Sequence, residues 1–155
     1  MIRTDLLITI AALLPAGVFA AEGGGAPPPA GAPDRAQLAA AVRAEFLRCW
    51  KAYEDYAWGH DELKPVSKAP RDWYGESLLI TPVDALDTML VMGLDAEATK
   101  TKALILERLS FDRDITVKNF EITIRLLGGL LSGYEMTGDE GLLRLADDLG
   151  TRLLP

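Results

Sequence analysis

The stretch 120–134 constrains the fold of this chain most, because apolar residues cover nearly the whole circumference of the helix that it would form. At about 100° per residue, a single narrow stripe interrupts them, and it consists of Glu121, Arg125, Gly128 and Ser132. A helix that is apolar almost all round is usually buried, and a buried carboxylate needs a partner or a task. The pattern therefore favours a buried helix on which Glu121 and Arg125 lie together.

An exposed ion pair is the simpler interpretation of the same spacing, and it would contribute only about 0.2–0.5 kcal/mol. Two glycines instead favour close packing of another group against this helix. Gly128 and Gly129 would each cost roughly 1 kcal/mol relative to alanine inside a helix, so we expect another group to approach closely at this point. Either a pocket or a tight helix crossing would account for both glycines.

The beginning of the chain differs in composition from the rest. Residues 1–20 have the features of a secretory signal: Arg3, an apolar run and a small-residue cleavage site at residues 18–20. A retained N-terminal anchor is the alternative. Residues 21–33 are nearly all Gly, Pro and Ala, which is typical of a linker. We therefore expect an exported protein, periplasmic or secreted, without a stable membrane span, in which residues 34–155 are the foldable part.

Charge and single residues exclude several functions. The net charge is −7, and no cluster of Lys and Arg alternates with aromatic residues, which argues against a nucleic-acid partner. Cys49 is the only cysteine, so the chain forms no internal disulfide; its aromatic neighbours predict a small core residue. His60 is the only histidine, which excludes a His-rich metal site and a Ser/His/Asp triad.

Apolar spacing predicts a series of amphipathic helices. They are expected at about 35–57, at 81–92 with Thr81 as cap, at 96–109 with Asp95 as cap, from 120 to the Thr137-Gly138 pair, and after the cap Asp139. Residues 64–77 are expected to form a surface loop, and residues 110–118 a loop or a short strand. The expected core stripes include Leu38, Val42, Phe46, Cys49, Tyr53 and Tyr56 in the first helix and Ala103, Leu106 and Leu109 in the third. Short links between helices predict antiparallel helical pairs.

Two further groups of acids are candidates for a site. Asp61 and Glu62 follow Trp58, and they either cap and solvate a turn or, together with an aromatic ring, bind a sugar. Asp84 and Asp87 share one helix face, which is either exposed or the lining of a site. Residue types alone leave these alternatives open.

Taken together, these blocks resemble the opening part of family 47 glycoside hydrolases, the class I α-1,2-mannosidases. The resemblance rests on Tyr53-x-x-Tyr56-Ala-Trp58-Gly-x-Asp61-Glu62-Leu63-x-Pro65, Val83-Asp84-Ala-Leu86-Asp87-Thr88, Met92-Gly93-Leu94, Phe120-Glu121-x-Thr123-Ile124-Arg125-x-Leu127-Gly128-Gly129-Leu130-Leu131 and Leu142-Leu143-x-x-Ala146-x-x-Leu149-Gly150. The blocks occur in the family's order and extend from about residue 45 to residue 155. A chain of blocks in order is far more specific than any single motif.

The resemblance implies an all-α fold, in which antiparallel helical hairpins form the first part of an (α/α)7 barrel. It also implies calcium dependence and inverting hydrolysis of terminal α-1,2-linked mannose from high-mannose oligosaccharides or glycoproteins. Glu121 would be the general acid, and Arg125 would lie in the same site and bind substrate. Asp61, Glu62, Asp84 and Asp87 would line or support the sugar pocket. Inverting hydrolysis needs an acid and a second carboxylate about 6.5–9.5 Å apart, the second to activate water.

The family's later helices have no counterpart in this sequence. The base carboxylate and the calcium-binding threonine, which those helices supply in the family, therefore have none either. We therefore expect the N-terminal portion of a catalytic domain, inactive alone, with no metal ligand of its own and with uncovered helix faces prone to self-association. The alternative is a non-catalytic, exported helical module that binds glycan or protein. An inert fragment is a third interpretation.

Overall fold

The structure, a computed structural model, describes residues 34–154. The predicted signal and linker, residues 1–20 and 21–33, lie outside the described residues. The helices are α1 (Arg35–Ala57), α2 (Ile80–Val91), α3 (Asp95–Arg108), α4 (Asn119–Ile122), the π-helical turn η1 (Thr123–Leu127), α5 (Gly128–Thr137) and α6 (Glu140–Leu153). Two strands, β1 (Glu62–Lys64) and β2 (Ala69–Arg71), form a hairpin. None of the described helices combines the length and the apolarity that crossing a membrane requires.

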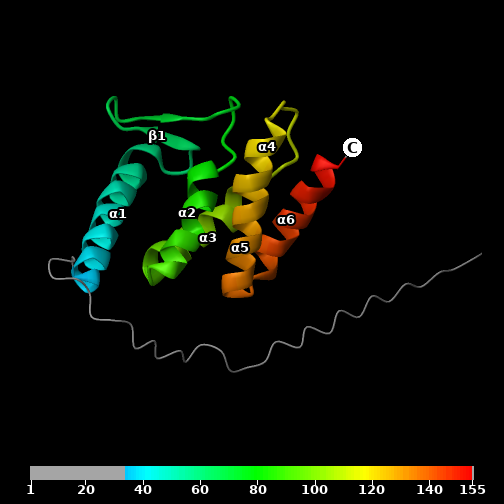
Figure 1. Cartoon of the computed structure of the whole chain (residues 1–155). Coiled ribbons are helices and arrows are strands. Elements are labelled where there is room, and N and C mark those ends of the chain that lie inside the picture. The colour runs from blue at the N-terminus through cyan, green and yellow to red at the C-terminus, as the bar shows by residue number, and fades with distance from the viewer. Residues whose placement is uncertain (1–33, 155) are drawn as a thin grey trace, which may run out of the picture. The chain divides into compact units, whose positions relative to one another are not determined.

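Neighbouring helices in the chain pack in pairs, α2 with α3 and α5 with α6, and α2 also packs against α5 (Figure 1). Short connections at residues 92–94 and 138–139 turn the chain back between the members of each pair. The predicted all-α class with antiparallel helical hairpins is therefore confirmed. Figure 1 also shows that the β-hairpin lies at the same end of the helices as α4.

The hairpin corrects the predicted surface loop at residues 64–77. Its strands pair antiparallel, with Glu62 opposite Arg71 and Leu63 opposite Pro70. Proline within the segment indicated a loop, but in a two-stranded sheet each strand has a free edge, where a proline removes no ladder bond. The segment 110–118 contains no helix or strand, in agreement with the predicted loop.

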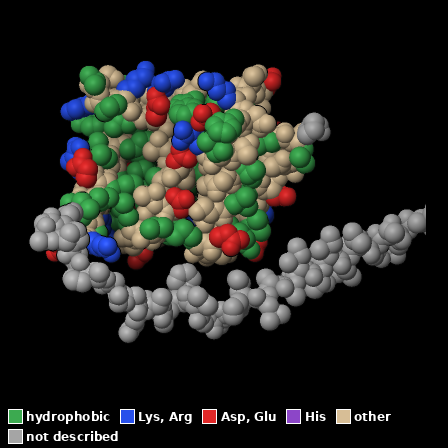
Figure 2. All heavy atoms as spheres, in the orientation of Figure 1, with side chains coloured by type: hydrophobic (Ala, Val, Ile, Leu, Met, Phe, Trp, Pro, Cys, Tyr) green, Lys and Arg blue, Asp and Glu red, His purple; other side chains and the backbone are tan. Residues whose placement is uncertain are grey.

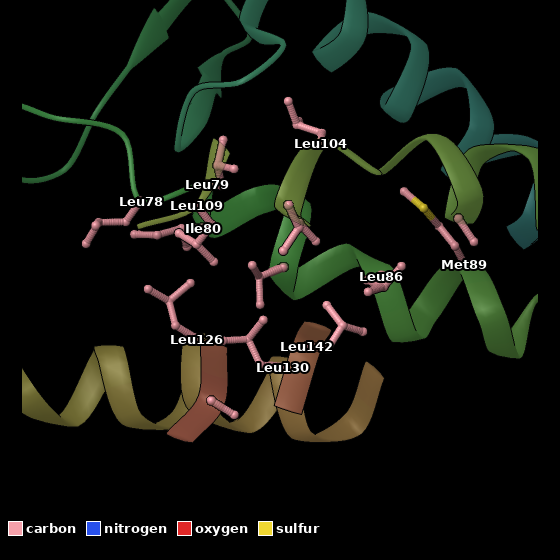
Figure 3. Close-up of a cluster of buried hydrophobic side chains, with 14 of the residues drawn as sticks. Leu78, Leu79, Ile80, Leu86, Met89, Leu104, Leu109, Leu126, Leu130 and Leu142 are labelled. Atoms are coloured by element: carbon pink, nitrogen blue, oxygen red, sulfur yellow. The ribbon is translucent and has the colours of Figure 1, made fainter. Parts of the chain in front are cut away.

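The core lies between α2, α3, α5 and α6. Figure 3 shows Leu126 and Leu130 pointing from one helix toward α2, where Leu86 lies, with Leu142 of α6 beside them. All four of these leucines are almost completely buried. One face of the stretch 120–134 is therefore buried, as its composition predicts.

The opposite face of this stretch is not covered. Phe120, Ile124 and Leu131 expose 71%, 52% and 41% of their surface. The expectation that the helix is buried on nearly every side was therefore wrong for this face. Among residues 34–154, α2 and α6 are the longer helices that pack against η1 and α5, and Figure 3 shows Leu86 and Leu142 from these two helices at the buried face.

The stretch is also not a uniform α-helix. The helical segment extends from Asn119 to Thr137, close to the predicted bounds, but η1 interrupts it between Glu121 and Gly128. A π-helical turn bonds each N–H to the carbonyl five residues earlier, and such turns occur frequently at functional sites. Apolar spacing over a few residues does not distinguish a π-turn from an α-turn, so η1 could not be predicted from the sequence.

Two predicted core stripes were wrong in part. In α1, Leu38 and Val42 are half exposed and Cys49 is exposed, whereas Trp50, Tyr53 and Ala57 are buried. The reason is that α1 packs mainly through its C-terminal half, on the hairpin. In α3, Ala103 and Leu106 are exposed, and the buried side chains are Ala98, Thr101, Leu104 and Ile105. Leu109 is buried as predicted.

Of the three helix caps predicted at Thr81, Asp95 and Asp139, Asp139 acts as one: its Oδ1 accepts a bond from the amide of Gly141 at 3.0 Å. Thr81 lies inside α2, and its hydroxyl donates instead to the carbonyl of Asp61 at 2.6 Å. Asp95 is the first residue of α3, where no side chain caps the helix. A competing bond therefore accounts for the failed prediction at Thr81.

Gly129 marks the close approach that the paired glycines indicate. A Cβ atom at this residue would lie 2.8 Å from Cγ1 of Val83 and 3.1 Å from the carbonyl oxygen of Val83. Gly129 is therefore required because α5 crosses α2 tightly at this residue. At Gly128 the nearest such atom is the carbonyl oxygen of Thr123, at an ordinary 3.7 Å.

Alanine at the two glycines should consequently have opposite effects. We expect Gly129→Ala to lower the free energy of unfolding by about 1–3 kcal/mol, because the added methyl overpacks the crossing. Gly128→Ala should be neutral or raise it by up to about 1 kcal/mol through helix propensity. Urea unfolding followed by circular dichroism measures both variants. Equal destabilisation by both would show that the crossing does not depend on Gly129.

Candidate active site

Glu121 of α4 and Arg125 of η1 meet on the first turns of the helical segment 119–137, called the central helix below. Arg125 Nε donates to Glu121 Oε2 at 2.9 Å, and Arg125 Nη1 donates to Asp84 Oδ2 at 2.8 Å. All three side chains are partly buried, with 29–38% of their surface exposed. The guanidinium thus joins two carboxylates from two helices. This arrangement differs from an isolated surface ion pair, because Asp84 comes from α2, 41 positions earlier.

Asp87 extends the same line of polar groups along the α2–α5 contact. Its Oδ2 accepts a bond from the hydroxyl of Ser132 at 3.0 Å. The polar stripe of the central helix therefore faces the acids of α2, and both of these acids are partly buried. This placement argues against a fully exposed face for Asp84 and Asp87, although neither acid is among the residues that line the cavity beside Glu121.

Burial and charge raise the pKa of Asp84 above that of an ordinary aspartate. Burial is the largest cause, and the negative charges of Asp87 and Glu121 act in the same direction, while the bond from Arg125 opposes them. The bonds to Glu121 and Asp84 raise the pKa of Arg125 in turn. Asp84, Asp87 and Glu121 together carry more negative charge than Arg125 balances, so this group is locally acidic. On the face shown in Figure 2, acidic side chains lie close to a basic one near the middle.

The hairpin and Trp73, which follows it, form one wall of the site, and Glu121 and Arg125 form the other. Glu62 Oε1 accepts a bond from Arg71 Nη1 at 2.9 Å, and Glu62 Oε2 accepts one from the indole N–H of Trp73 at 2.8 Å. The Trp73 ring lies over Arg125, with its centroid 5.4 Å from Cζ. Trp73 was predicted only as part of a surface loop. The aromatic ring that lies beside a carboxylate in the cavity, as a sugar site requires, is therefore that of Trp73 and not that of Trp58.

Trp58 belongs to a different cluster. Its ring packs edge-on against Trp50 and Tyr53, and Lys100 Nζ lies 4.6 Å from the ring centroid. These contacts fix the C-terminal end of α1 against α3. Trp58 does not line the cavity beside Glu121 and Arg125.

A cavity of about 330 Å³ lies between the two walls, and it is lined by Glu62, Arg71, Trp73, Tyr74, Lys118, Glu121 and Arg125. This volume is at the lower end of the roughly 300–1,000 Å³ typical of ligand pockets. A larger hollow of about 630 Å³ lies between the start of α1 and the end of α2, but its lining contains no carboxylate. The smaller cavity is therefore the better candidate for acid–base chemistry.

Asp61 lies behind this cavity and does not line it. Its side chain is fully buried. Oδ1 accepts bonds from the amides of Leu78 and Ile80 at 2.7 and 3.2 Å, and Oδ2 accepts one from the amide of Trp73 at 3.0 Å. The hydroxyl of Ser77 is a further donor to Oδ1. Of the alternatives for this acid pair, Asp61 fixes a turn and supports the site, whereas Glu62 faces the cavity.

The cavity presents two glutamates in different states. Both oxygens of Glu62 are bound by Arg71 and Trp73. Glu121 is bound at Oε2 alone, so Oε1 has no hydrogen-bond partner among residues 34–154. A carboxyl group that is held at one oxygen and free at the other can exchange a proton with a ligand in the cavity. Within the same residues, no three His, Cys, Asp or Glu side chains are grouped so as to hold a metal ion.

Comparison with known proteins gives consistent results. The sequence model of glycosyl hydrolase family 47 matches residues 45–155. The human endoplasmic reticulum mannosyl-oligosaccharide 1,2-alpha-mannosidase is 50% identical over 110 residues, which are 71% of this chain and 16% of that protein. The mannosyl-oligosaccharide 1,2-alpha-mannosidase MNS1 of Arabidopsis thaliana is 45% identical over 114 residues, 74% of this chain and 20% of that protein.

Among solved structures, the alpha-1,2-mannosidase from Trichoderma reesei is similar, with a TM-score of 0.68 and 30% sequence identity. The match covers 75% of this chain and 27% of the Trichoderma chain. The chain thus spans less than a third of the length of each of these three proteins.

Proposed function

The chain belongs to glycosyl hydrolase family 47, and from this premise we propose that it forms part of an enzyme that removes terminal α-1,2-linked mannose from high-mannose oligosaccharides. The resemblance that its sequence blocks indicated is confirmed by the family match. Its helical hairpins form the first part of an (α/α)7 barrel, the fold of the similar Trichoderma enzyme. The activity is proposed by similarity to relatives whose names describe mannosidases.

The observation that supports this proposal most is the position of Glu121. It lines the cavity with one carboxyl oxygen free and the other held by Arg125. In the proposed inverting reaction, Glu121 protonates the glycosidic oxygen of the leaving sugar while a water molecule attacks the anomeric carbon from the opposite face. We assign the base that activates this water to none of the described residues. Donors occupy both oxygens of Glu62, and Asp84, which Arg125 bonds at Oδ2, does not line the cavity.

The neighbouring side chains have complementary proposed roles. Arg125 carries donors that suit sugar hydroxyls, and Glu62 and Trp73 form the opposite wall. Asp84 and Asp87 support Arg125 and Ser132. Calcium dependence is implied by the resemblance; among residues 34–154 no three His, Cys, Asp or Glu side chains are grouped so as to hold the ion, and the roles proposed for these residues do not involve it. Export, implied by residues 1–20, is likewise part of the proposal.

A chimeric enzyme tests the proposed activity. The stretch of the human endoplasmic reticulum enzyme that aligns with this chain is replaced by the matching residues of this chain, which are 50% identical to it. We expect the chimera to release mannose from α-1,2-linked mannobiose, whereas the human enzyme with the stretch deleted should release none. A folded chimera without activity, together with glycan binding by this chain alone, would instead support a non-catalytic binding module.

A further inference from the structure

We propose that Trp73 is a positioning residue whose ring, anchored by Glu62, confines the Arg125 guanidinium so that it bonds Glu121 and Asp84 at the same time. This inference rests on the proposed function only in its consequence for catalysis. The contacts that carry it are present in the structure whatever the reaction.

Trp73 is itself held at two points. Its amide donates to the buried carboxylate of Asp61 at 3.0 Å, and its indole N–H donates to Glu62 Oε2 at 2.8 Å. Glu62 is fixed in turn by Arg71, its partner directly across the hairpin, at 2.9 Å. Because the backbone and the ring are anchored separately, the ring cannot turn away from the cavity without breaking a hydrogen bond.

Arg125 has the geometry that such a ring can confine. The donors of a guanidinium lie in its plane, so its edge can bind carboxylates while its face remains free for an aromatic ring. In this structure Glu121 and Asp84 take two of the donors, and the Trp73 ring lies 5.4 Å from Cζ. A long and partly exposed side chain has many rotamers, and the ring excludes those in which Arg125 leaves the two carboxylates.

The consequence for the site is that the hairpin controls the acid through Arg125. Arg125 holds Glu121 at Oε2, which leaves Oε1 for a ligand in the cavity. Burial and the charges of Asp87 and Glu121 raise the pKa of Asp84, and Arg125 opposes this rise. When the ring is removed, Arg125 spends less time on Asp84, and the carboxyl of Asp84 then titrates at higher pH. Titration of Asp84 therefore reports the position of Arg125 without any hydrolysis.

Nuclear magnetic resonance on the full chain tests the inference. We expect Trp73→Leu to speed exchange of the Arg125 Nε–H with water by about tenfold, as expected for loss of a desolvated cation–π contact, and to raise the Asp84 titration midpoint. Tyr56→Leu is the matched control: the Tyr56 ring lies 5.2 Å from Lys68 Nζ, outside the cavity lining. It should leave both signals of Arg125 and Asp84 unchanged.

Two milder variants test the same inference if the Trp73→Leu chain does not fold. Trp73→Phe keeps an aromatic face but loses the bond to Glu62, and Glu62→Gln keeps an acceptor for the indole while weakening the bond to Arg71. Both should shift the two signals in the same direction as Trp73→Leu and by less. Wild-type exchange and titration in a folded Trp73→Leu chain would overturn the inference and leave the proposed activity untouched. Failure of the chimera to release mannose would instead overturn the proposed activity and leave the positioning role of Trp73 untouched.

Discussion

Asp61→Ala should lower the free energy of unfolding by about 3–5 kcal/mol, a value typical of removing one partner from a buried charged network. The side chain is fully buried and accepts bonds from the amides of Trp73, Leu78 and Ile80 and from the hydroxyl of Ser77. Alanine would leave these donors without an acceptor. Two of the amides lie just before and at the first residue of α2, where a negative charge also favours the helix dipole.

Two further variants make this prediction specific. Asp61→Asn keeps an oxygen for Leu78 and Ile80 but turns an NH₂ group toward the amide of Trp73, so we expect a smaller loss of about 1–3 kcal/mol. Asp112→Ala removes an aspartate whose side chain is 91% exposed, and it should change stability by no more than about 0.5 kcal/mol. Guanidinium unfolding measures all three variants. If Asp61→Ala behaved like Asp112→Ala, the buried carboxylate would not be what fixes the loop before α2.

Local spacing accounts for the part of the site that the sequence predicts. Glu121 and Arg125 are one turn apart on a helix, so their contact follows from helical geometry alone. The extent of α1, from Arg35 to Ala57, follows from the same periodicity and was predicted to the residue. A glycine pair inside an apolar helix indicates a close crossing, although only the structure shows that Gly129, and not Gly128, makes it.

The remaining features depend on contacts between distant residues. Arg125 reaches Asp84 across 41 positions, and Asp61 holds amides up to 19 positions away. The position of Trp73 over Arg125 depends on a hairpin of three-residue strands, one of which contains Pro70. The exposed Leu38 and Val42 of α1 have the same spacing as buried residues. Periodicity identifies the apolar positions of a helix, but the elements that pack on it decide which of them are buried.

Glu121→Gln is expected to reduce mannose release by roughly 10²–10⁴-fold, the usual contribution of a general acid. Glutamine has nearly the same shape and keeps an oxygen for the bond from Arg125, but it has no carboxyl proton to give to the leaving sugar. Fold and thermal stability should therefore stay close to those of the unchanged protein. Glu135→Gln, an exposed glutamate on α5 outside the cavity, is the matched control and should retain full activity.

The assignment of Glu121 as the acid is tested most directly by the rate of mannose release from α-1,2-linked mannobiose in the chimeric enzyme, measured with Glu121, with Glu121→Gln and with Glu135→Gln at equal protein concentration. If Glu121 is the acid, we expect release by the first and third proteins and a loss of at least about 100-fold in the second, with the same melting temperature for all three. Substantial turnover by the Glu121→Gln protein would contradict it, because the proton for the leaving sugar would then come from another residue.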